Sequence, residues 1–276
     1  MKIFTSLENA FSDPILVEML DLSFKDIDEL PKKICDLRNL KKLNLSDNQL
    51  EELPSNFGNL QNLEWLDLQK NLLEFLPLSF LNLSKLKYLS LYKNEIISLD
   101  KDFGRLQNLQ YLILKGNNLN LLPETLFDLN KLEYLGLESN NITIFSERVI
   151  DLIYLKQLSL SDNDIEILPV NICLLENLEQ LAIDRNPLKL LPDLIGNLKK
   201  LKKLDLRDTN LQSIPDSICD LEQLDYLFLG KNYISKLPDR IGDLKNLSYM
   251  DLTSNNFGLN EKERIIEIFP NITIDW

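Results

Sequence analysis

Leucine recurs along the chain with a period of 23 residues. The first row of this pattern starts at Val17, where later rows have leucine. In the row that starts at Leu40, leucine fills positions one, four, six, eleven and fourteen, with Asn48 at position nine and Pro54 at position fifteen. The same register continues, without insertion or deletion, in rows that start at Leu63, Leu86, Leu109, Leu132, Leu155, Leu178, Leu201, Leu224 and Leu247. The sequence therefore predicts eleven stacked repeats, the last one modified, that share one continuous core.

Each position of the repeat predicts a local structure. Alternation of polar and apolar residues, as from Lys42 to Ser46, indicates a short strand with two inward leucines, and copies of it are expected to pair as a parallel sheet. The asparagine is expected to bond backbone groups of adjoining turns, and the proline to start a return segment of extended or 3-10 turns. The exceptions are Lys25 and Thr209 in place of asparagine, and Asp100 and Ser146 in place of proline.

The pattern LxxLxLxxNxLxxLPxxIxxL resembles the signature of leucine-rich repeat proteins. Its 23-residue form with Leu-Pro is similar to the Ras-suppressor-type group and to bacterial repeat proteins. This resemblance implies an α/β solenoid, a horseshoe with a parallel β-sheet on the concave face and short 3-10 or extended segments on the convex face. The expected organisation is an N-terminal helical cap over 1–16, eleven repeats over 17–259 and a helix-plus-strand cap over 260–276.

Both predicted caps have signals of their own. Thr5 and Glu8 fit a capping box at the start of a short helix, whose Leu7 and Phe11 would cover the first repeat. Near the other end, a helix is expected to begin at Asn260 and to stop before Pro270. Its apolar residues and those of the strand expected to follow it are Ile265, Ile266, Ile268, Phe269, Ile272, Ile274 and Trp276.

The three cysteines, Cys35, Cys173 and Cys219, are separated by multiples of 23 residues and so share one position of the repeat. Cys173 and Cys219 lie two repeats apart, roughly 10 Å at the spacing of strands, which exceeds the reach of a disulfide. We expect free thiols in small packing positions, because other repeats have glycine there. Free thiols together with Lys-, Asn- and Ile-rich composition are typical of a bacterial protein.

The net charge and the lack of catalytic motifs reduce the number of functional classes that fit this sequence. The net charge of −13 argues against nucleic acid and anionic membranes as partners, and no apolar run is long enough to span a membrane. The chain has no histidine, no phosphate-binding glycine loop and no paired cysteines, so no enzyme activity, cofactor or metal is expected. Asp184, Asp205 and Asp208 are interpreted as a solvated acidic strip. The predicted location is cytoplasmic, or secreted or delivered to a host cell if a signal was removed.

Aromatic residues accumulate at position three, which faces outward from the predicted sheet. Four consecutive repeats form a ladder there, which nearby residues extend or border: Trp65, Tyr88, Tyr111 and Tyr134, with Tyr92, Ile113, Lys70, Lys93 and Lys115. A second cluster is expected from Tyr226, Phe228, Tyr233 and Tyr249. One interpretation is that stacked rings at this position stabilise the sheet and have no other role. They can also anchor a partner, since Tyr and Trp dominate binding hot spots.

The favoured function is therefore a non-catalytic, monomeric protein-protein interaction scaffold that grips an unidentified protein on its concave face. A bacterial host-interaction or effector-type role fits this prediction. The alternative is a glycan-binding module, because aromatic platforms also stack on sugar rings.

Overall fold

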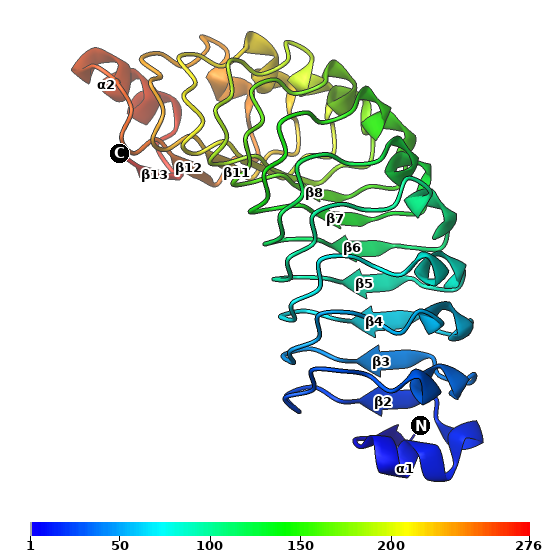
Figure 1. Cartoon of the computed structure of the whole chain (residues 1–276). Helices are drawn as coiled ribbons and strands as arrows, with labels where there is room; N and C mark the ends of the chain where they lie inside the picture. The colour runs from blue at the N-terminus through cyan, green and yellow to red at the C-terminus, as the bar shows by residue number, and fades with distance from the viewer. Residues whose placement is uncertain (1) are drawn as a thin grey trace. The chain divides into compact units, whose positions relative to one another are not determined.

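The computed structural model describes residues 2–276, which form two compact units, one ending at Asn140 and the other spanning Asn141–Trp276. In each unit, short parallel strands line one face, the sheet face, and 3-10 turns line the opposite face (Figure 1). The chain is thus a solenoid of 23-residue repeats, as the sequence predicts.

The N-terminal unit contains seven parallel strands that pair in chain order. From β2 to β7 the paired residues are 23 apart, as Lys42 and Trp65 are, whereas β1 pairs with β2 at a separation of 16 residues. The elements are β1 (Ile3–Phe4), α1 (Leu7–Ser12), β2 (Met19–Asp21), β3 (Lys42–Asn44), β4 (Trp65–Asp67), β5 (Tyr88–Ser90), β6 (Tyr111–Ile113) and β7 (Tyr134–Gly136).

The C-terminal unit repeats this arrangement with one helix near its end. Its strands are also parallel, and β13 pairs with β12. The elements are β8 (Gln157–Ser159), β9 (Gln180–Ala182), β10 (Lys203–Asp205), β11 (Tyr226–Phe228), β12 (Tyr249–Asp251), α2 (Leu259–Ile268) and β13 (Thr273–Asp275).

The return segments are 3-10 turns of three to five residues, which confirms the prediction. Several begin directly after the repeat's proline, as η6 (Glu124–Asp128) does after Pro123. A proline suits this place because its missing N–H would have no partner there. Where proline is replaced, a side chain bonds the backbone at the start of the return turn: the Ser146 hydroxyl accepts the N–H of Arg148, and the Asp100 carboxylate accepts that of Asp102.

The core consists of the repeat leucines, almost all fully buried, and in the N-terminal unit of a row of phenylalanines. Phe57 and Phe80, from successive repeats, stack with ring centroids 6.0 Å apart. Leu43 and Leu45 illustrate the inward strand positions, both with no exposed surface. The alternation of polar and apolar residues therefore places each leucine where the stack needs an apolar side chain.

A ladder of buried asparagines bonds the backbone of adjoining turns. Asn94 donates its amide to the carbonyls of Leu68 and Leu91, at 2.9 and 3.0 Å, and accepts the N–H of Leu73 at 3.2 Å. The residue before the asparagine takes a positive φ in most repeats, for example Lys93 at 52°. The asparagine thus supplies hydrogen bonds where the chain leaves the strand and cannot form a regular backbone ladder.

Thr209, which replaces one ladder asparagine, is accompanied by a change in the preceding repeat. Its hydroxyl donates to the Leu206 carbonyl at 2.7 Å, and the side-chain oxygen of Asn232 lies 3.0 Å from the same hydroxyl. The N–H of Leu188, which the missing asparagine would have accepted, bonds the carbonyl of Asn186 at 2.8 Å instead. Pro187 lies between these two residues, so the local turn is tighter and no backbone donor is lost.

The terminal elements differ in detail from the prediction. Ser6, not Thr5, caps α1 by accepting the N–H of Asn9 at 3.3 Å, and Ala10 is the buried residue of that helix, while Leu7 and Phe11 are only half-buried. Strand β1, which no periodicity predicts, precedes the helix. At the other end α2 and β13 are present, with Ile265 and Phe269 buried but Ile266 exposed.

Candidate functional site

The aromatic ladder predicted from position three is present on the sheet face of the N-terminal unit. Trp65 and Tyr88 stack with ring centroids 5.1 Å apart and planes 11° from parallel. Tyr111 lies 6.4 Å from Tyr88 and 6.5 Å from Tyr134. Four successive strands, β4 to β7, therefore hold one continuous run of rings, because the parallel register places residues 23 apart side by side.

The ladder is accessible and partly charged at its border. Tyr111 is the most open ring, with 42% of its surface exposed. Lys93 lies over the Tyr92 ring, 5.4 Å from its centroid, whereas Lys70 forms an ion pair with Asp47 at 2.8 Å. Tyr92, Ile113 and Lys115 are half-buried. The three lysines do not form a uniform cationic rim, since Lys70 is already paired.

Tyr134 ends the ladder by lying down over a glycine. A Cβ atom added to Gly136 would lie 2.9 Å from Cε1 of the Tyr134 ring, so no larger residue fits beneath this ring as it stands. Burial, followed by the charge of Glu138, raises the pKa of Tyr134 to about 12. One carboxylate oxygen of Glu138 is buried without a hydrogen-bond partner. The last ring thus lies close to its own strand.

A buried carboxylate lies beside the first two rings, and no pattern in the sequence signals its burial. Asp67 has 8% of its surface exposed and accepts the N–H of Gln69 at 2.9 Å. Burial is the main cause that raises its pKa; the charges of Asp47 and Asp21 act in the same direction, and hydrogen bonds from Gln69 and Ser90 oppose them. The ionised form of Asp67 therefore lowers the free energy of unfolding.

Substitution of Asp67 by Asn is expected to raise the unfolding temperature at pH 7. The pKa of Asp67 is higher in the folded state than in the unfolded state. The contribution of Asp67 to stability is therefore complete below its unfolded-state pKa of about 3.9 and is lost as pH rises through its folded-state pKa. The introduced amide would keep an acceptor oxygen without the charge. Thermal melts from pH 3 to 8 should show the advantage shrinking as pH falls, while Asp28→Asn, at an exposed position, changes little. A gain independent of pH would contradict this account.

A pocket of about 350 Å³ opens at the β4 end of the ladder. Trp65 forms one wall, Ile3 and Met19 supply apolar surface, and Asp21 and Lys42 supply charge. Strand β1 creates this pocket by adding Ile3 beside Met19. A partner side chain that enters it would contact the Trp65 ring.

The second aromatic cluster, on the sheet face of the C-terminal unit, has three members rather than four. Phe228 lies 6.3 Å from Tyr226 and 5.3 Å from Tyr249, between ring centroids. Lys203 and Arg207 both lie over the Phe228 ring, at 5.3 and 4.9 Å from its centroid. The structure separates Tyr233 from this cluster: it follows the ladder asparagine, outside β11, and makes no ring contact among residues 2–276.

Two acidic residues of the C-terminal sheet face, Asp184 and Asp205, form ion pairs with arginines. Asp184 accepts a hydrogen bond from Ser161 and pairs with Arg185 at 2.6 Å, and Asp205 pairs with Arg207 at 2.5 Å. Asp184 and Asp205 are also buried, so the expectation of a fully solvated strip is wrong for them. Across residues 2–276 no cluster of three or more potential metal ligands occurs.

The cysteines are free and buried, as predicted. Burial raises the pKa of Cys35, Cys173 and Cys219 to about 11 each. A thiol of that pKa is almost entirely protonated at neutral pH and is a poor nucleophile. Within the part of the chain that the structure describes, no helix has the length and apolar character needed to cross a bilayer.

A solenoid of 23-residue repeats, each with leucine, asparagine and proline at fixed positions, places this chain in the class of repeat proteins. Family profiles agree: one described as "Leucine rich repeat" matches residues 15–73, 75–119 and 94–142, and one described as "Leucine-rich repeat region" matches residues 181–268. The chain belongs to the leucine-rich repeat family. No curated protein sequence matches it.

Solved structures of the same fold span bacterial and receptor proteins. A "TDR receptor" is 28% identical with a TM-score of 0.86, and the match covers 99% of this chain but 49% of the receptor. A complex of latrophilin 3, Unc5D and the repeat protein FLRT2 gives 25% identity and a TM-score of 0.78, covering 93% and 82%. A leucine-rich repeat protein of Leptospira interrogans is 27% identical over 100% of both chains, with a TM-score of 0.51.

Proposed function

We propose that this chain is a non-catalytic scaffold that binds a protein partner on its sheet face, with the ladder of Trp65, Tyr88, Tyr111 and Tyr134 as the anchor. The observation that carries the proposal is the continuous run of four rings, one exposed and three half-buried, next to a pocket walled by Trp65. Large rings with few rotatable bonds bury much area at little entropic cost.

The comparisons support a protein as the partner class. FLRT2 occurs in a complex with two other proteins, and a plant peptide hormone receptor 25% identical to this chain occurs in complex with RGF2. The net charge of −13 further disfavours nucleic acid. The Leptospira protein supports a bacterial source. A role toward a host cell and a monomeric state stay predictions.

Capture from native lysate tests the class of partner. The immobilised chain is incubated with lysate that has been digested either with a protease or with glycosidases. Capture should disappear after protease treatment and survive glycosidase treatment, because a protein surface supplies the contacts. Capture that survives the protease, together with selective binding on a glycan array, would replace this proposal with the glycan-binding alternative.

A further inference from the structure

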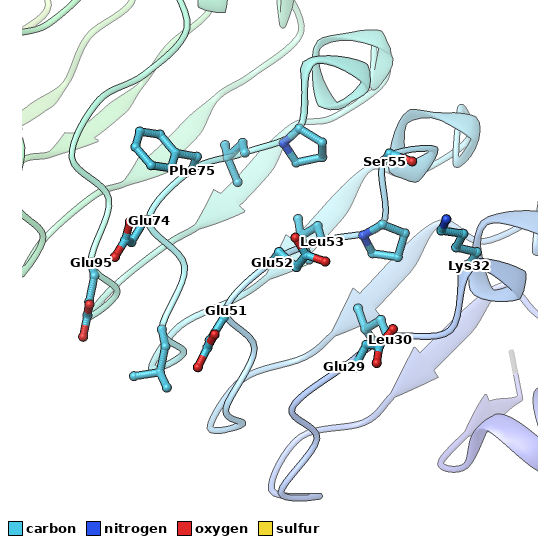
Figure 2. A pocket seen from close by; sticks show the side chains of 14 residues that line it. Glu29, Leu30, Lys32, Glu51, Glu52, Leu53, Ser55, Glu74, Phe75 and Glu95 are labelled. Atoms are coloured by element: carbon cyan, nitrogen blue, oxygen red, sulfur yellow. The ribbon is translucent and has the colours of Figure 1, made fainter.

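A second surface of the N-terminal unit lies away from the sheet face, between the asparagine turns and the 3-10 turns. It is a groove of about 860 Å³ with a floor of leucine and proline. Its residues come from four successive repeats, represented by Glu29, Glu51, Glu74 and Glu95 (Figure 2). The groove therefore runs along the stack and crosses repeats, and its volume is that of ligand-binding clefts.

Apolar side chains are exposed in this groove. Phe75 has 55% of its surface exposed and Leu72 has 42%. Figure 2 shows the Phe75 ring projecting beside Glu74. A phenylalanine whose ring remains in water lacks the burial that normally stabilises it, so the ring is available for a partner.

The charge of the groove is unbalanced. Five glutamates and one lysine line it, Glu29, Glu51, Glu52, Glu74, Glu95 and Lys32, and all six are exposed. None of the five glutamates forms an ion pair within residues 2–276. Elsewhere on the unit two glutamates pair with lysines across repeats, Glu18 with Lys41 and Glu64 with Lys87, each at 2.7 Å. The groove carboxylates repel one another, and a cationic ligand would relieve that repulsion.

We propose that this groove is a second docking surface, which binds an extended basic peptide segment of a protein partner with an apolar side chain on Phe75. Neighbouring strands of such a stack are about 4.8 Å apart, and an extended peptide rises about 3.3 Å per residue. Four or five residues of the segment therefore span the groove. Cations on one side of the segment meet the glutamates while an alternate apolar residue packs on Phe75.

The probe is a fluorescein-labelled octapeptide of alternating lysine and leucine, titrated with the full chain and followed by fluorescence anisotropy. Two reference peptides have glutamate in place of lysine, or the same residues with all lysines preceding all leucines. The lysine-leucine peptide should bind in a 1:1 complex, and the glutamate peptide should not. Equal binding of the two lysine peptides would overturn the proposal, because the alternation would then not matter.

Variants assign the binding to the groove. Glu51→Lys with Glu74→Lys should weaken binding at least tenfold, and Phe75→Ser should weaken it several-fold at 150 mM salt, where screening reduces the charge contribution. The matched control is Glu176→Lys with Glu263→Lys, which changes the net charge equally at exposed sites of the C-terminal unit. Its affinity should stay within twofold of the original. An equal loss in this control, or no loss in Phe75→Ser, would show attraction by overall charge instead of a docking groove.

Discussion

Replacement of Asn94 by alanine is expected to lower the free energy of unfolding by about 3 kcal/mol. The loss has two parts. The N–H of Leu73 is left buried without its acceptor, while the carbonyls of Leu68 and Leu91 each lose one of two asparagine donors, since Asn71 and Asn117 also bond them. The orphaned donor accounts for most of the cost, because an unpaired buried group loses its hydration without compensation.

Urea unfolding followed by circular dichroism measures this loss, and hydrogen exchange locates it. The Leu73 amide should exchange much faster in the variant than in the original chain. The control is Asn118→Ala, at an exposed asparagine of the next repeat, which should change stability by less than about 0.5 kcal/mol. Asn94→Thr should lie between the two, since Thr209 shows that a hydroxyl at this position bonds the carbonyl three residues before it. Equal stability of the Asn94 and Asn118 variants would show that the asparagine ladder does not stabilise the fold.

The repeat itself could be predicted because each of its positions has one physical task. Leucines at fixed intervals must face inward, so position three must face outward, and the register then places Trp65 beside Tyr88. Strand β1 could not be predicted, because Ile3–Phe4 is too short to show any alternation. Ser6 and Thr5 are both good helix caps, and only the path of the chain decides between them.

The features missed around the site depend on packing between repeats. Asp67 becomes buried because neighbouring repeats surround it, which one strand's pattern does not reveal. Tyr233 is separated from Phe228 because the chain turns at Asn232, after the strand has ended. The glutamates of the groove occupy positions ten to thirteen, where no strict alternation exists. Glutamates between positions ten and thirteen of four successive repeats are the available signal.

Substitutions in the aromatic ladder are expected to have the largest effect on partner binding. Trp65→Ala with Tyr111→Ala should weaken partner capture at least about 100-fold, because each ring at the centre of an interface typically contributes about 2 kcal/mol or more. Unfolding should be affected less. The double variant loses the contacts of Trp65 with Tyr88 and of Tyr111 with its two neighbours, a cost of about 1–3 kcal/mol. The melting temperature is thus expected to fall by a few degrees and the fold to persist.

The matched control removes two exposed aromatic rings elsewhere: Tyr154→Ala with Phe24→Ala. Both rings lie outside the ladder, so this variant should capture the partner as the original chain does. Quantitative capture at equal protein concentration, with circular dichroism on each sample, separates lost binding from lost fold. If the folded ladder variant captures as much partner as the control variant, then the rings serve only to stabilise the sheet, and the partner must bind another surface.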